Sequence, residues 1–233
     1  LREPITGDVE LTYTYPGHTG LLQRTVSGTR GDIQAPAGTV VKLVTRSDRP
    51  VERAGLSIGE AWVPLEVREG RQLSGSFVVE RGGHYAFVFQ DDDAREVARG
   101  PDLPITVEAD GVPQVTLRAP EQELEVDPEE EVELRWDVRD DYGLTGLSLV
   151  YREPGASEET RVKLDLQDGR TQSGRYRWST KNLRLSPGDR VTYYVEALDN
   201  DAIAGPKKGV SRTQTLKLYD ASEKRQLALE RVE

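Results

Sequence analysis

Acidic residues gather at three places along the chain, each directly after a run of apolar and aromatic residues. Ca²⁺ in proteins takes about six to eight oxygen ligands, and neighbouring carboxylates on the end loops of a β domain can supply them. The clusters therefore provide candidate calcium ligands, and no other cofactor is predicted. The candidates are Asp91, Asp92, Asp93, Asp140, Asp141, Asp199, Asn200 and Asp201.

A second interpretation of these clusters needs no metal. Asp and Asn often end strands because their side chains hydrogen-bond to nearby main-chain N–H groups in turns. The spacing of the acidic residues also differs from the ligand loop of an EF-hand. The pattern leaves calcium ligands and turn residues as alternatives.

Residues suited to catalysis are few. The chain has two histidines, His18 and His84, and no cysteine, so a thiolate zinc site is excluded. Ser and Asp are plentiful, so counting alone leaves a Ser-His-Asp arrangement open. A glycosidase needs paired carboxylates in a cleft lined with aromatic residues, which make up only 6% of this chain. The sequence therefore predicts that the protein is not an enzyme.

Three tryptophans could stack on sugar rings, as in a carbohydrate-binding module. Trp136 alternates with Leu134 and Val138, which instead predicts a core position for this residue. Trp62 and Trp178 fit neither role clearly.

Two charged segments have a possible binding role and a simpler explanation. Residues Glu121–Glu133 contain many carboxylates and no basic residue, which suits either a docking face for a basic partner or an exposed edge strand. The composition of residues Gly205–Gly209 predicts a solvated basic turn. The net charge of −10 argues against nucleic acid as a partner and against direct adsorption to an anionic membrane.

The segments that must position these residues show a period of two, which is typical of β-strands. In the first half, apolar and polar residues alternate in short runs separated by Gly- and Pro-containing turns. These predicted strands are Val9–Tyr15, Thr39–Thr45, Ala61–Val67, Leu73–Val79, Tyr85–Phe89 and Leu103–Val107.

The second half repeats the same plan, and Asp168-Gly169 is typical of a hairpin turn. Its predicted strands are Val115–Leu117, Val132–Val138, Leu147–Tyr151, Arg161–Leu166, Tyr176–Trp178, Val191–Leu198 and Thr213–Leu218. Many short strands without intervening helices favour an all-β fold made of immunoglobulin-like, or fibronectin III-like, β-sandwiches.

An internal repeat divides the chain into domains. The segment from Tyr85 to Asp93 aligns with that from Tyr193 to Asp201, and each is followed by Gly-Pro and a final strand. We expect tandem sandwiches at residues 1–110 and 111–219. Residues 220–233 begin a helix, because Asp220 is a suitable N-cap with Glu223 three residues later.

The recurring sequence motifs resemble those of a bacterial family. They include Asp140-Asp141-Tyr142-Gly143-Leu144, Tyr193-Tyr194-Val195-Glu196-Ala197-Leu198-Asp199-Asn200-Asp201, and Gly31-Asp32-Ile33 with Ala35-Pro36. They resemble membrane-anchored envelope proteins of Gram-negative bacteria, in which transmembrane helices precede tandem Ig-like domains and a long helical, coiled-coil-prone region. The resemblance spans nearly the whole chain and supplies no catalytic residue.

These observations together predict a non-catalytic, extracytoplasmic scaffold that binds a protein partner of the cell envelope. The alternative is a calcium-stiffened or carbohydrate-binding adhesive module. The chain starts at Leu1, has no Met and lacks an apolar run of about 18 residues, so we expect an excised segment. By the resemblance it is periplasmic and anchored to the inner membrane by a segment outside this chain.

Overall fold

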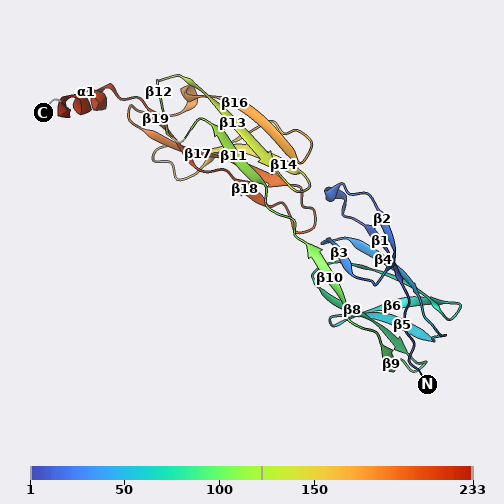
Figure 1. Ribbon diagram of the computed structural model, residues 1–233. Coiled ribbons are helices and arrows are strands. Elements are labelled where there is room, and N and C mark those ends of the chain that lie inside the picture. Colours follow the sequence, from blue (N-terminus) through green and yellow to red (C-terminus); the bar gives the residue numbers. More distant parts are fainter. Residues whose placement is uncertain (1, 122, 232–233) are drawn as a thin grey trace. The chain divides into compact units, whose positions relative to one another are not determined.

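The computed structural model describes residues 2–121 and 123–231. The chain divides into two compact units, Leu1–Asp110 (unit 1) and Gly111–Glu233 (unit 2). β-strands are the main regular structure of both units, and the single α-helix of the described residues lies in the last part of unit 2 (Figure 1).

Unit 1 is one continuous hydrogen-bonded sheet folded into two layers. The order of its strands is β2-β1-β4-β7-β6-β5-β8-β10-β3, and β9 pairs with β8. The strands are β1 (Val9–Thr14), β2 (Arg24–Thr29), β3 (Ile33–Pro36), β4 (Val40–Arg46), β5 (Arg53–Ile58), β6 (Ala61–Arg68), β7 (Gln72–Val78), β8 (Gly83–Gln90), β9 (Glu96–Arg99) and β10 (Leu103–Glu108), with a 3₁₀ turn η1 (Gly17–Thr19).

Strand β6 connects the two layers of unit 1. Its residues 61–65 pair with β5, whereas its residues 66–68 pair with β7. One strand thus belongs to both sheets.

Unit 2 contains two separate sheets, β11-β13-β16 and β12-β19-β17-β14-β15, with β18 paired to β17. The strands are β11 (Gln114–Ala119), β12 (Glu123–Val126), β13 (Glu131–Arg139), β14 (Leu144–Arg152), β15 (Thr160–Lys163), β16 (Thr171–Ser179), β17 (Arg190–Asp199), β18 (Lys208–Val210) and β19 (Gln214–Leu218), with a 3₁₀ turn η2 (Thr180–Asn182).

The two units have the same topology. The path β1-β4-β7 of unit 1 corresponds to β11-β13-β16, and β6-β5-β8-β10-β3 corresponds to β15-β14-β17-β19-β12. In each unit one short strand runs parallel to the last strand, β3 with β10 and β12 with β19. This strand order is that of an immunoglobulin-like sandwich. The predicted fold class is therefore confirmed, and β2 is an addition in unit 1.

Alternating side chains fill one core in each unit. In β4, Val41 and Leu43 are completely buried, whereas the intervening Lys42 is exposed. In β13, Leu134, Trp136 and Val138 all join the core, which confirms the core position predicted for Trp136. Each sheet hides one face and leaves the other to solvent, as a two-layer sandwich requires.

The predicted hairpin at Asp168-Gly169 is wrong. Strand β15 pairs with β14, whereas β16 pairs with β13 in the other sheet. The turn therefore carries the chain from one layer to the other, and its residue types did not reveal which strand the chain would join.

The terminal helix α1 (Ala221–Glu230) confirms the predicted helix start. The Asp220 side chain accepts a hydrogen bond from Ser222 N (2.8 Å) and caps the first turn. Glu223 pairs with Lys217 and so departs from the reciprocal capping-box contact. No side chain of α1 is buried. The described residues contain no helix with the length and apolar character needed to cross a bilayer.

The aligned tyrosines occupy matching positions at the start of β8 and β17. Both are buried, and the Tyr85 hydroxyl donates to the Gly31 carbonyl at 2.6 Å. Gly31 has φ of 107°, and a Cβ there would lie 2.6 Å from the Tyr85 hydroxyl, so only glycine fits. The Tyr193 hydroxyl lies 3.3 Å from Gln214 Oε1, which is a longer and weaker contact.

We expect Tyr85→Phe to lower the free energy of unfolding by about 1–2 kcal/mol, because it leaves the buried Gly31 carbonyl without this donor. The matched variant Tyr193→Phe should cost less, about 0.5–1 kcal/mol. Urea unfolding of both variants measures the difference. Equal losses of unfolding free energy in the two variants would show that the Tyr85–Gly31 hydrogen bond contributes no more to stability than the Tyr193–Gln214 contact.

Candidate functional site

The first acidic cluster closes a turn in unit 1. Asp91 Oδ1 accepts a hydrogen bond from Arg95 N at 2.9 Å, and Asp91 N donates to the Arg95 carbonyl at 3.0 Å. Asp93 lies 3.7 Å from the Arg95 guanidinium, and both side chains are exposed. Asp92 is also exposed. This cluster therefore performs the turn function that its residue types allow.

The third cluster surrounds a lysine in unit 2. Lys207 Nζ lies 2.8 Å from Asp199 Oδ2 and 2.8 Å from Asp201 Oδ2. Asp199 is completely buried, and the Lys207 side chain is about one-quarter exposed. We call Asp199, Asp201 and Lys207 the Lys207 cluster. The ammonium group holds the position between two carboxylates that a bound cation would take.

Main-chain groups satisfy the remaining carboxylate oxygens of the Lys207 cluster. Asp199 Oδ1 accepts hydrogen bonds from Lys207 N (2.7 Å) and Asp201 N (3.2 Å). Asp201 Oδ1 accepts from Ile203 N (2.8 Å) and Ala204 N (3.0 Å). Three of the four carboxylate oxygens thus accept hydrogen bonds, and the fourth, Asp199 Oδ2, has the ion pair with Lys207 as its contact. The prediction of a solvated basic turn at residues 205–209 is wrong for Lys207, because its ammonium group faces the buried Asp199 carboxylate.

The pKa of Asp201 reflects two opposed influences. Burial favours the neutral form, but the Lys207 ammonium and the N–H groups of Ile203 and Ala204 favour the carboxylate more strongly. Together they lower the pKa of Asp201 to about 2. The carboxylate therefore stays charged across the physiological range.

The second cluster lies on the loop between β13 and β14, next to the loop after β17. Asp140 Oδ2 accepts hydrogen bonds from Tyr142 N (2.9 Å) and Gly143 N (2.8 Å). Asp141 Oδ2 accepts from Gly111 N at 2.8 Å. Asn200 N donates to the Gly143 carbonyl at 3.1 Å, which ties the two loops together. A Cβ at Gly143, where φ is 151°, would lie 2.9 Å from the Asn200 side chain.

Five of the eight calcium candidates thus lie on two adjoining loops of unit 2, while Asp91, Asp92 and Asp93 belong to unit 1. The hydrogen bonds and the Lys207 ammonium compete directly with any metal for the oxygens of Asp199 and Asp201. Calcium ligation by these residues stays a prediction.

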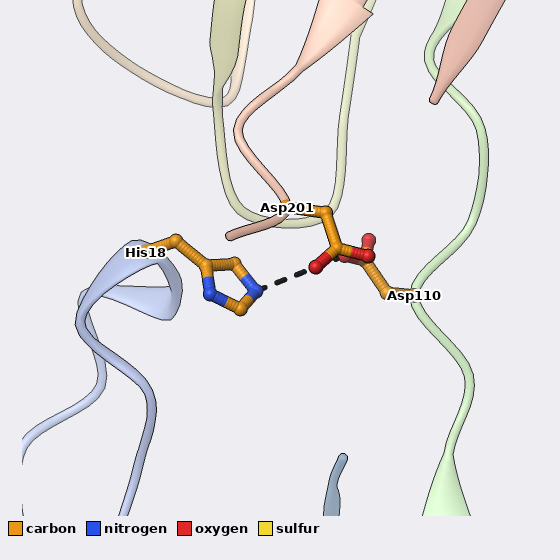
Figure 2. A group of neighbouring side chains, drawn as sticks. All are labelled: His18, Asp110 and Asp201. Carbon is orange, nitrogen blue, oxygen red and sulfur yellow. Dashed lines mark ion pairs between the residues drawn. The ribbon is translucent and has the colours of Figure 1, made fainter. Parts of the chain in front are cut away.

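The two histidines lie on different elements of unit 1. His18 belongs to η1, and its Nε2 atom lies 3.9 Å from an Asp110 carboxylate oxygen (Figure 2). This separation suits an ion pair if the imidazole is protonated, but it exceeds a hydrogen bond. His84 is exposed at the start of β8, opposite Pro104.

Unit 1 also contains one sequence motif that is associated with catalysis. Residues Gly55-Leu56-Ser57-Ile58-Gly59 match the Gly-x-Ser-x-Gly spacing of serine hydrolases. In those enzymes the serine occupies a sharp turn from a strand into a helix. Here Ser57 lies within β5, paired with Trp62 of β6 and Ala86 of β8. Among the described residues His84 makes no hydrogen bond to Ser57, so the motif is a strand and not a nucleophile elbow.

Two of the three tryptophans are inside the core of unit 2. Trp136 and Trp178 are 3% and 4% exposed. The Trp178 ring lies 5.1 Å from Tyr151 and 5.2 Å from Tyr193, between ring centroids. Of the three, only Trp62 has substantial accessible surface, at 42% exposure. Its ring lies against Gly55, because a Cβ at that position would lie 2.1 Å from a carbon atom of the ring. A sugar-stacking platform would therefore rest on Trp62 alone among these three.

Four of the eight acidic residues in the stretch Glu121–Glu133 form ion pairs with basic residues in the described part of unit 2. Within it, β12 forms an edge of its sheet. The ion pairs are Glu123–Arg190 (3.2 Å), Glu125–Lys224 (2.7 Å), Glu129–Lys181 (3.7 Å) and Glu133–Arg135 (2.6 Å). This arrangement supports the edge-strand interpretation over a dedicated docking face for a basic partner.

Comparison with known proteins identifies no family for this chain. No family model matches the chain, and no curated protein matches it. Among solved structures, it is similar to titin domains Z1Z2 in complex with telethonin (TM-score 0.34, 16% identity, 90% of this chain and 95% of that one). It is also similar to the fibronectin(III)-like modules of Clostridium thermocellum CbhA (0.28, 16%, 81% and 88%) and to a marsupial T cell receptor (0.38, 11%, 80% and 70%). The strand order described above remains the basis of the fold assignment.

We expect Lys207→Met to lower the free energy of unfolding by about 3 kcal/mol, because it leaves the buried Asp199 carboxylate without its cation. The matched variant Lys208→Met should cost less than about 1 kcal/mol, since Lys208 is half exposed and Arg161 also faces its partner Glu196. Urea unfolding compares the two.

Lys207→Met also tests the prediction of calcium binding. Millimolar calcium should leave the melting temperature of the wild-type protein unchanged and raise that of Lys207→Met, because a cation that binds the native state stabilises it. A rise in the wild-type melting temperature would contradict the view that Lys207 takes the place of the metal.

Acid should weaken the Lys207 cluster. The folded-state pKa of Asp201 is about 2 and the unfolded value is about 3.9, so its stabilisation is present above pH 4 and is lost as pH falls toward 2. Asp201→Asn lacks this contribution. The stability difference between wild type and Asp201→Asn should therefore shrink between pH 4 and pH 2, as measured by urea unfolding. Asp92→Asn, at an exposed site, is the control.

Proposed function

We propose that the chain is a non-catalytic, extracytoplasmic scaffold and protein-interaction segment of a bacterial cell-envelope protein. One observation carries the proposal. The side chains best suited to chemistry are engaged in the fold itself, while strand edges and outer sheet faces stay available.

Strand edges are the natural recognition surfaces of such a module. An edge strand presents main-chain N–H and C=O groups that can pair with a strand of another protein. In unit 2, the nine-residue strand β16 (Thr171–Ser179) has β13 on one side and forms the edge of its sheet. Exposed Arg175 and Arg177 on this edge disfavour pairing with a second copy of the same strand and favour a partner that carries acidic residues.

The arrangement along the chain supports the envelope location. Two sandwiches that share a core strand order are followed by α1, none of whose side chains is buried. A helix of this kind suits continuation away from the sandwich and matches the order of segments in the envelope proteins that the sequence resembles. We therefore propose a periplasmic location, with anchoring to the inner membrane through a segment outside this chain.

The experiment is an affinity capture from solubilised bacterial envelope extracts with the full chain as bait. We expect a specific protein partner whose recovery falls when Arg175 and Arg177 are both changed to Glu. Arg118→Glu, on the same sheet but on β11, reverses one charge and is the control for the single variants Arg175→Glu and Arg177→Glu. Capture of no protein, together with specific binding on a glycan array that Trp62→Ala abolishes, would reject the scaffold in favour of a carbohydrate-binding module.

A further inference from the structure

Unit 1 contains an apolar pocket beside its first residues. The pocket has a volume of about 480 Å³, within the range of small-ligand and side-chain pockets. Its apolar lining comes from the segment before β1, from β8 and from the entry to β10. These lining residues are Pro4, Ile5, Phe87, Phe89, Pro101 and Leu103.

The segment that forms one wall of the pocket is a strand with an open side. Gly7 N donates to the Arg46 carbonyl at 2.9 Å, and Asp48 N donates to the Ile5 carbonyl at 2.9 Å. Thr6 forms a β-bridge with Ser47 between these two bonds. In antiparallel pairing, the residue between two such bonds points its own N–H and C=O groups away from the partner strand. The main chain of Thr6 therefore faces the outer side.

In the described part of unit 1, no strand pairs with that side of Thr6. Strand β2 pairs with β1 only from Val9 onward, opposite Thr29. Within residues 2–121, no hydrogen-bond partner is present for Thr6 N or Thr6 O. Thr6 and Thr29 both line the pocket. An open main-chain edge and an apolar pocket thus lie next to each other.

The rim of the pocket carries charges of both signs. Asp8 and Arg30 are exposed and line the opening, and neither forms an ion pair within the described part of unit 1. A peptide offers donors, acceptors and side chains of either sign to such a rim, whereas a fatty acid offers only a carboxylate. The charges therefore favour a peptide over a lipid.

We propose that this pocket binds an extended peptide segment of a partner protein by strand addition. The peptide pairs with the main chain of Thr6 and places one bulky apolar side chain against Ile5, Pro101 and Leu103, the lining residues that keep accessible apolar surface. Main-chain pairing supplies general affinity, and the pocket selects the inserted residue. The inference rests on the proposed function, because it gives the interaction segment a specific site and a chemistry for its partner.

The test uses a random heptapeptide library displayed on phage, selected against the full chain. We expect enriched sequences to alternate polar and apolar residues around a central Phe, Leu or Ile. A fluorescein-labelled synthetic copy of the most enriched peptide then gives a dissociation constant by anisotropy. Hydrogen–deuterium exchange with this peptide should protect the amide of Thr6.

Two variants test the two parts of the site. Ile5→Asp puts a carboxylate at the apolar wall and should weaken binding at least about tenfold. Thr6→Pro removes the outward N–H, which makes no bond to the neighbouring strand, so binding should fall while the melting temperature is kept. Leu22→Asp, at an 88% exposed leucine outside the pocket, should bind as wild type does.

Several results would overturn the proposal. They are the absence of enriched peptides, equal peptide binding by Ile5→Asp and wild type, and amide protection away from Thr6. An envelope partner recovered equally well by Ile5→Asp would reject this pocket and leave the scaffold function standing. Peptide binding that meets every expectation, without any envelope partner in the capture experiment, would support the pocket and reject the scaffold function.

Discussion

Both units depend on the burial of alternate side chains between two sheets. In each unit, one face of every central strand joins a core, as Val41 and Leu43 do in β4 and Leu134 and Trp136 do in β13. Burial of apolar area is the main stabilising contribution in such a domain, and it commits half of each strand to packing. Recognition is therefore left to strand edges, outer faces and loops, and the candidate site and both proposals follow from that constraint.

The Lys207 cluster shows how a fold can meet the electrostatic demand that a metal would otherwise meet. The buried carboxylate of Asp199 needs a compensating charge, because an isolated ion in a protein interior is strongly unfavourable. Lys207 supplies that charge from six residues beyond Asp201, and main-chain N–H groups complete the coordination of the oxygens. The ion pairs and hydrogen bonds of this cluster hold the loop after β17 in position.

Periodicity in the sequence predicts most of the long strands and the short β15, but it misses β2, β5 and the other short strands. Strands β3, β9, β12 and β18 have three or four residues each, too few for a period of two to stand out. The repeat of Tyr85 and Tyr193 correctly marks equivalent strands, because both tyrosines occupy the same place in a duplicated topology. The role of Lys207 depends on a loop that folds back on β17, and local residue types carry no such information. The pocket beside Thr6 likewise depends on segments distant in sequence.

Strand β6 gives unit 1 a mechanical property that unit 2 lacks in its described part. Because residues 61–65 of β6 are bonded to one layer and residues 66–68 to the other, main-chain hydrogen bonds run without interruption from layer to layer. Sliding one layer past the other must therefore shear this strand from a neighbour. In unit 2 the layers meet through side chains and connecting loops. A stretching force would have to break main-chain hydrogen bonds to move the two layers of unit 1 past each other. In unit 2 the same movement would break side-chain contacts between the sheets.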